Sequence, residues 1–253
     1  MSIKLTLKET PTVPLEAEVL SPSHLAELSH SEICGLRLYH GKRQMRVDDF
    51  FDVEGERSDQ VEIHGDLRRV RLLGRAMTRG HLSIHGSVGM HLGAHMKGGR
   101  IDVYGDASDW IGAEMTNGFI HVHGNGGGQI GGGYRGSLRG MKNGTIVIGG
   151  IVKDFCGLQM KGGTIVLQSG AEIRTGAWMN RGTIISLVPL QLMPTFQLSC
   201  YYNPTFLNVY GRYLMTMGIR LPWSAQDGSW ARYYGDCSVP GKGEIFIWNP
   251  HGN

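Results

Sequence analysis

The sequence has few cysteines, no long apolar run and almost no charge imbalance. Cys34, Cys156, Cys200 and Cys237 lie far apart and form no C-x-x-C pair, so we expect four free thiols in a reducing compartment. No stretch approaches the roughly 18 apolar residues of a transmembrane helix, and the polar start MSIKLTLKETP lacks a secretory core. With 19% charged residues and a net charge of +3, the chain shows no basic nucleic-acid patch and no acidic tail. These absences predict a cytoplasmic protein without a membrane or nucleic-acid partner.

Glycine is what the chain has in excess, with 39 glycines in 253 residues, 29 of them between positions 61 and 182. Their spacing is periodic, with a unit of 19 residues in which the pattern G-x-x-M-x-x-G recurs. One gap of 26 residues interrupts the period, between the third and fourth methionine. The methionines that define the period are Met77, Met96, Met115, Met141, Met160 and Met179. Such a fixed period predicts a repeat architecture.

Each unit predicts one short β-strand. Apolar residues alternate with other residues in HLSIHG (81–86), RIDVYG (100–105), FIHVHG (119–124) and TIVIGG (145–150), which is typical of strands with one buried face. A helix is disfavoured because each glycine would cost it about 1 kcal/mol relative to alanine. We therefore predict an all-β fold, a right-handed parallel β-helix (solenoid) with about 19 residues per coil. The six methionines would form a structural ladder inside it.

The densest glycine stretch, GNGGGQIGGG at 124–133, contains the G-x-G-x-x-G spacing of dinucleotide-binding sites. Such a site needs a helix directly after the glycines, and GGGYRGSLRG cannot start a stable one. The period instead predicts corner glycines, where φ is positive or a Cβ atom has no room. These corner glycines are Gly86, Gly89, Gly93, Gly124, Gly127 and Gly131. We expect no cofactor-binding residue in this chain.

Seven extra residues lie between Gly131 and Met141, where the period is interrupted. This insertion follows Tyr134, at the expected ladder position, and carries Arg135 and Arg139. Insertions into such arrays often map to a binding face. Two interpretations stay open, a contact with a partner and a plain surface loop.

The chain divides into three predicted segments. Residues 1–60 are expected to cover the first coil, 61–187 to form the β-helix, and 188–253 to form an aromatic-rich C-terminal cap or interface. Terminal segments of this kind are needed because a bare last coil would expose a sheet edge.

The C-terminal cap is predicted to contain a helix. Asn203-Pro204 is a start signal, and Phe206, Tyr210 and Tyr213 follow at helical spacing. This helix could pack on the last coil, dock another protein of a complex, or do both with different faces. The three aromatic residues are therefore candidate partner contacts.

No catalytic or metal site follows from side-chain spacing. His64, His85 and His123 share one position of the unit, but His85 and His123 lie two coils apart, too far to share a zinc ion at about 2.1 Å. His121 and His123 point to one side of a strand, and no third ligand of obvious spacing joins them. We interpret these imidazoles as a polar outer ladder and Cys156 as a small apolar filler. No G-x-S-x-G nucleophile elbow occurs.

The pattern G-A-x-M-x-x-G, followed by a short strand and G-x-x-G-x-x-x-G (Gly86, Gly89, Gly93), resembles a known family. It is similar to the β-helix shared by the C subunit of formylmethanofuran dehydrogenase and the C-terminal domain of glutamate synthase. The resemblance covers residues 61–186 and favours the stand-alone C subunit, because little else is present. The ending NPTFLNVYGRYL…RYYGD…GKGEIFIW looks more like the C subunit of the bacterial formyltransferase/hydrolase complex.

The resemblance implies a non-catalytic scaffold subunit in the one-carbon metabolism of methylotrophs. Its partners would be a formyltransferase subunit, which moves a formyl group from tetrahydromethanopterin to a methanofuran-like carrier, and an amidohydrolase-like subunit, which releases formate. The resemblance assigns neither catalytic residues nor a cofactor to this chain. Three alternatives stay open. They are the C subunit of the tungsten or molybdenum formylmethanofuran dehydrogenase, an autonomous solenoid enzyme, and a glutamate synthase-like domain that acts in trans.

Overall fold

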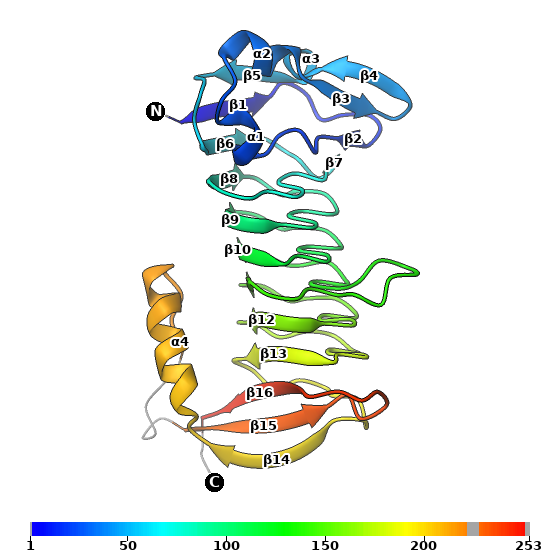
Figure 1. The fold of residues 1–253 in the computed structure, drawn as a ribbon, viewed down its shortest axis with the longest axis vertical. Coiled ribbons are helices and arrows are strands. Elements are labelled where there is room, and N and C mark those ends of the chain that lie inside the picture. Colours follow the sequence, from blue (N-terminus) through cyan, green and yellow to red (C-terminus); the bar gives the residue numbers. More distant parts are fainter. Residues whose placement is uncertain (1, 222–227, 251–253) are drawn as a thin grey trace.

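Stacked strands dominate the computed structural model, which describes residues 2–221 and 228–250 (Figure 1). One 12-stranded sheet runs the length of the molecule, in the order β14 (Gln197–Tyr202), β15 (Ser229–Gly235), β16 (Gly243–Asn249), β13 (Arg181–Ser186), β12 (Lys161–Leu167), β11 (Thr145–Ile148), β10 (Asn117–Val122), β9 (Lys97–Val103), β8 (His81–His85), β6 (Gln60–His64), β1 (Ile3–Leu7) and β5 (Phe51–Glu54). A four-stranded sheet comprises β4 (Arg43–Arg46), β3 (Arg37–His40), β2 (Leu15–Glu16) and β7 (Val70–Arg71). The helices are α1 (Pro22–Leu25), α2 (His30–Gly35), α3 (Val47–Phe50) and α4 (Thr205–Thr216).

The middle of the large sheet is parallel, and its register follows the 19-residue period. Leu82 on β8 pairs with Ile101 on β9, 19 residues later, and the register is kept across the 26-residue gap, where Ile120 on β10 pairs with Ile146 on β11. The strand segments predicted from apolar alternation overlap β8, β9, β10 and β11. The alternating apolar side chains of these strands, such as Leu82, Ile101, Ile120 and Ile146, point to one core, in which the six periodic methionines are fully buried.

The prediction of an all-β right-handed parallel β-helix is wrong. Most strands of the chain form one large mixed sheet, in which antiparallel pairs lie at both ends of the parallel strands. Four helices are also present in the described part of the chain. On the far side of each turn of chain, the described residues outside the named strands pair through isolated bridges, such as Val88 to Ala107 and Ala107 to Gly126, and through single backbone hydrogen bonds between turns. The physical reason for the short pairing on the far side is the number of residues at positive φ, both glycine and non-glycine. Residues at positive φ, such as Gly93 and His95, leave no room for a second run of extended backbone in each unit.

Both ends of the chain enter the same sheet as its middle. At the N-terminal end, β1 lies parallel to β6 and antiparallel to β5. At the C-terminal end, β16 lies parallel to β13 and is followed by the antiparallel strands β15 and β14. Parts of the predicted C-terminal segment, residues 222–227 and 251–253, lie outside the described residues. These end strands pair with the first and last strands of the parallel array.

Helix α4 begins after Pro204, as the sequence predicts, and extends over 12 residues. Of the helices in the described part of the chain, none has the length and apolar character needed to cross a membrane. All four cysteines are free thiols. Burial raises the pKa of Cys156 to about 12, which fits an inert apolar filler.

Candidate functional site

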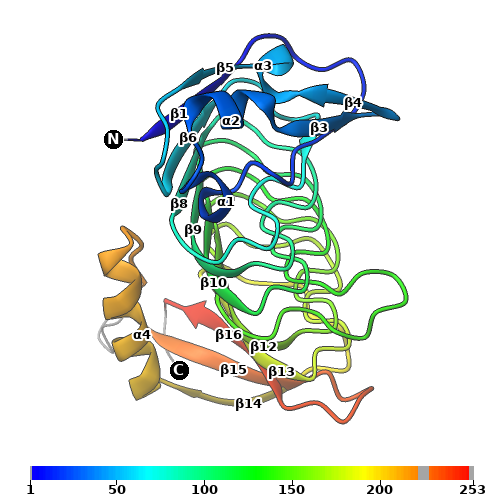
Figure 2. The same ribbon diagram turned by 45° about the horizontal axis from the view of Figure 1, so that its top comes forward.

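The outer face of the large sheet, opposite the methionine-lined core, is partly covered by helix α4 (Figure 2). Side chains alternate between the two faces along each strand, so the outer face holds a separate apolar cluster. Leu207 and Leu214 of α4 are buried in it. The cluster's sheet residues are Phe119, Val147, Val166, Ile185, Trp230, Phe246 and Trp248. Helix α4 is thereby fixed on strands that lie far from it in the sequence.

One side of α4 faces the sheet through polar as well as apolar contacts. The hydroxyl groups of Tyr210 and Thr145 are 2.6 Å apart, and burial raises the pKa of Tyr210. The Arg100 guanidinium lies over the Phe119 ring at 5.4 Å and 3.1 Å from the Met217 sulfur. The structure therefore directs Tyr210, one of the predicted partner contacts, toward the sheet.

Several apolar side chains of α4 are exposed, on its outer side and along the edges where it meets the sheet. Val209 has 67% of its surface exposed, and Phe206, Tyr213 and Met215 are exposed beside it. The neighbouring strand β14 adds Leu198, Tyr201 and Tyr202, also exposed. We call these seven residues the α4–β14 surface. Exposed apolar side chains gathered on neighbouring elements are candidates for docking another protein, and Phe206 and Tyr213 of the predicted contacts belong to this surface.

Tyr134, at the start of the predicted insertion, is half-buried in a cluster of rings. Its hydroxyl lies 3.1 Å from His91 Nδ1, and its ring centroid lies 4.9 Å from that of Trp110. Its backbone N–H donates to the Glu114 carboxylate at 3.2 Å. Burial raises the pKa of Tyr134 to about 12. These contacts anchor the base of the insertion to the neighbouring turns of chain.

The tip of the insertion projects from the side of the molecule opposite α4 (Figures 1 and 2). Arg135 and Arg139 are exposed there, and Leu138 between them has 71% of its surface exposed. Leu138 also lines an open pocket of about 440 Å³ that includes the exposed Trp178. The structure thus places the two predicted arginines beside an apolar surface that the sequence did not indicate.

The predicted corner glycines lie where turns of chain approach each other. A Cβ atom on Gly89 would be 2.5 Å from the Val70 carbonyl oxygen, and one on Gly93, with φ +60°, would be 2.6 Å from Ile120 Cδ1. Close backbone or side-chain atoms also surround the other four, Gly86, Gly124, Gly127 and Gly131. Residues 131–144 contain no helix, so the glycine-rich stretch lacks the element that a dinucleotide site requires.

A buried carboxylate organises the outer face beyond the end of α4. Asp102 is 1% exposed, accepts a hydrogen bond from Arg100 Nη2 at 2.8 Å, and lies 2.6 Å from His81 Nε2 and 3.7 Å from His121 Nδ1. Burial alone would favour the protonated acid, but these neighbours hold the pKa of Asp102 well below its usual range. The group is a fully compensated anion.

Asp102 was missed as a neighbour of His121, on β10, and of His123, which follows the last residue of that strand. Donor atoms of Asp102, His121 and His123 all lie within 4.8 Å of one another, so a third possible donor does lie beside the two histidines. The carboxylate comes from β9, whose register places Asp102 opposite His121. The signal was present in the sequence, since Asp102 precedes His121 by one 19-residue period.

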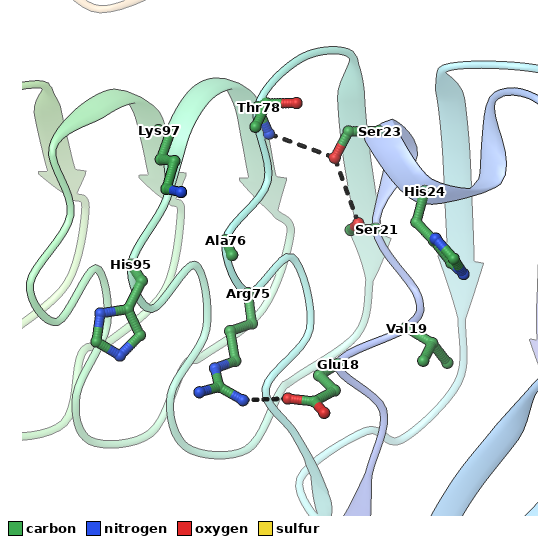
Figure 3. A pocket seen from close by; sticks show the side chains of 10 residues that line it. All are labelled: Glu18, Val19, Ser21, Ser23, His24, Arg75, Ala76, Thr78, His95 and Lys97. Carbon is green, nitrogen blue, oxygen red and sulfur yellow. Dashed lines mark hydrogen bonds and ion pairs between the residues drawn. The ribbon is translucent and has the colours of Figure 1, made fainter.

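An open groove of about 710 Å³ separates the N-terminal segment from the stacked turns (Figure 3). Arg75 forms an ion pair with Glu18 across it, and the Ser23 hydroxyl accepts a hydrogen bond from the Thr78 N–H at 3.3 Å. His95 and Lys97 also line the groove. Its described polar contacts join the N-terminal segment to the sheet.

Part of the chain is similar in sequence to formylmethanofuran dehydrogenases, although no family model matches it. Over 97 residues the chain is 40% identical to the C subunit of the tungsten-containing formylmethanofuran dehydrogenase 2 from Methanothermobacter wolfeii. It is 37% identical over 95 residues to the C subunit of the molybdenum-containing enzyme 1 from Methanothermobacter thermautotrophicus. The matched segments span 36% and 24% of these relatives, and 36% and 37% of this chain.

A solved structure matches over nearly the whole chain. It is a chain of the formyltransferase/hydrolase complex from Methylorubrum extorquens, in complex with methylofuran. The TM-score is 0.81 at 28% identity, with 96% of this chain and 98% of that chain covered. Together with the curated relatives, this similarity supports a C subunit of the formylmethanofuran dehydrogenase family.

Proposed function

We propose that this chain is a non-catalytic scaffold subunit of a formyltransferase/hydrolase complex. That complex would move a formyl group from tetrahydromethanopterin to a methanofuran-like carrier and release formate. The observation that carries the proposal is the similarity to a chain of the Methylorubrum extorquens complex, with a TM-score of 0.81 over 96% of this chain. The carriers would bind to the partner subunits, and the periodic methionines and glycines of this chain would serve its own packing.

The arrangement of exposed apolar side chains supports a bridging role. The α4–β14 surface and the tip of the insertion lie on opposite sides of the stacked strands (Figure 1). Two partners could therefore bind at once without competing for the same residues. The buried methionines and close glycine contacts between turns make the structure connecting both surfaces stiff. We propose that one surface receives the formyltransferase subunit and the other the hydrolase subunit.

The C subunit of a tungsten or molybdenum formylmethanofuran dehydrogenase is the second candidate. The observation that favours it is the higher local identity, 40% over 97 residues. It ranks second because that match spans 36% of this chain. The partners separate the two candidates: a formyltransferase and an amidohydrolase support the first, and molybdopterin or iron–sulfur subunits support the second.

A binding experiment with charged substitutions tests the scaffold proposal. Val209→Asp places a charge in the α4–β14 surface and Leu138→Asp places one at the tip of the insertion. Both side chains are highly exposed, at 67% and 71%, so we expect the folded chain to be unaffected. Each variant should release one partner subunit and retain the other in a pull-down of the reconstituted complex.

Val13→Asp provides a matched control, because Val13 is an exposed valine in the N-terminal segment. It should retain both partners. Retention of both partners by all three variants would contradict the proposed surfaces. Formyl transfer or formyl hydrolysis by the purified chain alone would contradict the non-catalytic role itself.

A further inference from the structure

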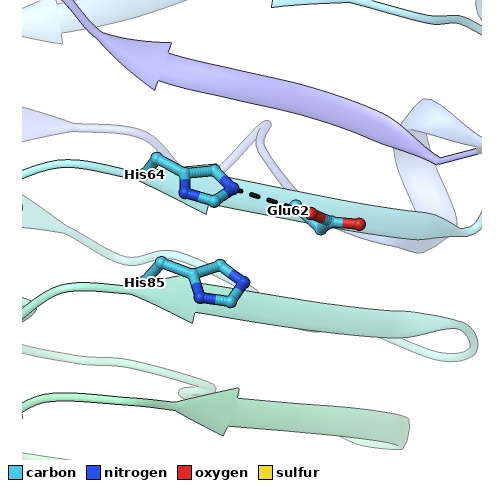
Figure 4. A group of neighbouring side chains, drawn as sticks. All are labelled: Glu62, His64 and His85. Carbon is cyan, nitrogen blue, oxygen red and sulfur yellow. Dashed lines mark ion pairs between the residues drawn. The ribbon is translucent and has the colours of Figure 1, made fainter.

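Two histidines lie side by side on the neighbouring strands β6 and β8 (Figure 4), which are nearer the N-terminal end of the sheet than the strands beside α4 (Figure 1). His64 ends β6 and His85 ends β8, and the parallel register pairs these two residues directly. Their imidazole rings are stacked with centroids 4.3 Å apart and planes 8° apart. Both rings are therefore held side by side by the backbone pairing, which spaces neighbouring strands by about 4.8 Å.

A carboxylate completes the group from the same face. Glu62 precedes His64 by two residues on β6, so its side chain points to the same side of the sheet (Figure 4). Its Oε2 lies 3.6 Å from His64 Nε2, which is too long for a hydrogen bond. His64 Nε2 is buried and has no hydrogen-bond partner among the described residues. A buried polar nitrogen of this kind calls for a further ligand.

We propose that Glu62, His64 and His85 bind a divalent transition-metal ion of the zinc class. Their donor atoms lie within 4.8 Å of one another. Two donors on one tetrahedral zinc ion, each about 2.1 Å away, are roughly 3.4 Å apart, and the ion lies near the plane of each imidazole, so one of the two stacked rings must rotate to bind it. His85 is exposed and Glu62 is half-exposed, which leaves both free to make this adjustment. Two imidazoles and one carboxylate leave a fourth position for water or another ligand.

The surroundings of the three residues are compatible with a cation. Lys4 on β1 is the paired neighbour of Glu62 on β6. Its ammonium group, however, pairs with the Glu54 carboxylate at 3.3 Å. Tyr104 stacks on the other side of His85, with ring centroids 4.9 Å apart. The Tyr104 ring thus bounds the space in which the exposed His85 ring can rotate, and the pairing of Lys4 with Glu54 leaves the Glu62 carboxylate available.

The second group of possible ligands, Asp102, His121 and His123, is a weaker candidate on physical grounds. Both oxygens of Asp102 already face the Arg100 guanidinium, and one of them also faces His81. A metal ion there would lie next to a guanidinium whose charge the carboxylate already neutralises. The Glu62 group has no arginine in the same contact among the described residues, so we assign the ion to it.

Cobalt titration of the full chain tests the proposal. After treatment with a chelator, the protein is titrated with Co²⁺ and the visible absorption is followed, and Zn²⁺ is then added as a competitor. We expect a single site with the intense bands of four-coordinate cobalt, displaced by Zn²⁺. Loss of an outer-shell partner already costs about 10- to 100-fold in metal affinity, so His85→Gln and Glu62→Gln should cost at least that.

His123→Gln is the matched control, because His123 occupies the same unit position two turns away and belongs to the rejected group. Its cobalt affinity should equal that of the unsubstituted chain. No cobalt binding by the unsubstituted chain would overturn the proposal. So would unchanged affinity in His85→Gln and Glu62→Gln, or a loss confined to His123→Gln. A sulfur-to-cobalt charge-transfer band would assign the ion to a cysteine and would equally overturn it.

Discussion

At the scale of single residues, the spacing of methionine and glycine follows from contacts between turns. The Met77 methyl group lies 2.6 Å from the place of a Cβ on Gly99, and Met96 and Met115 have the same relation to Gly118 and Gly144. The methionine of one unit thus occupies the space that a side chain would fill in the next. The period in the sequence records this interlocking, and it explains why the glycine three residues after each methionine recurs.

Gly89→Ala tests how tightly the turns approach. The new Cβ would lie 2.5 Å from the Val70 carbonyl oxygen and 2.8 Å from that of Arg68, and backbone atoms cannot move aside cheaply. We expect the free energy of unfolding to fall by about 1–3 kcal/mol, as for other overpacked sites. Gly35→Ala is the control, because nothing lies within 4 Å of its Cβ position. Urea denaturation of both variants measures the difference; equal stabilities would contradict the close approach.

Asp102→Asn tests the buried ion cluster. The substitution removes the negative charge of the Asp102 carboxylate, which contacts both Arg100 and His81. It should lower the free energy of unfolding by about 1–3 kcal/mol at pH 7. The pKa of Asp102 is lower in the folded chain than in the unfolded one, so the stabilisation exists above about pH 4 and is lost as the pH falls further. The difference between the two proteins should therefore shrink in acid. Denaturation at several pH values checks this, and a constant difference would contradict it.

At the scale of secondary-structure elements, α4 divides into a buried and an exposed side. The sequence predicted this helix from Asn203-Pro204 and the spacing of its aromatic residues, and the structure confirms the helix. Which aromatic faces the sheet was not predictable, because that depends on Thr145, a residue far away in the sequence. The helix is therefore held by tertiary packing on strands β10 to β13 and β16.

Leu214→Ala and Met215→Ala separate the two sides of α4. Leu214 is fully buried, so its truncation should cost about 2–5 kcal/mol of unfolding free energy. Met215 is 48% exposed, so its truncation should change the stability by less than about 0.5 kcal/mol. Thermal or urea unfolding gives both values. Similar losses in the two variants would show that α4 is not seated as described.

At the scale of the whole molecule, the sequence predicted the strands and their parallel neighbours better than the architecture. The alternation in segments such as HLSIHG located strands, and the 19-residue period matches the pairing of Leu82 with Ile101. The period says nothing about the ends, where non-periodic segments add antiparallel strands to the same sheet. It also does not distinguish extended backbone from isolated bridges on the far side of each turn.

Contacts of the candidate residues were predictable from the sequence only within the part of the chain that follows the 19-residue period. The glycines and methionines lie in the periodic region, and their contacts repeat with the period. The exposed pair Leu138 and Trp178 was not predictable, because the two residues come from different units and meet through the irregular insertion. His64 and His85 were not considered together as possible metal donors, although the period places the two strands side by side.

The scaffold role is tested most directly by the size and composition of the native assembly. The tagged chain is purified from cells that express it at its natural level, and the mass and components of the product are determined by native mass spectrometry. We expect this chain in fixed stoichiometry with a formyltransferase and an amidohydrolase-like subunit, with formyl transfer lost when the chain is removed. A lone monomer, or an isolated chain that retains formyl transfer, would contradict the account.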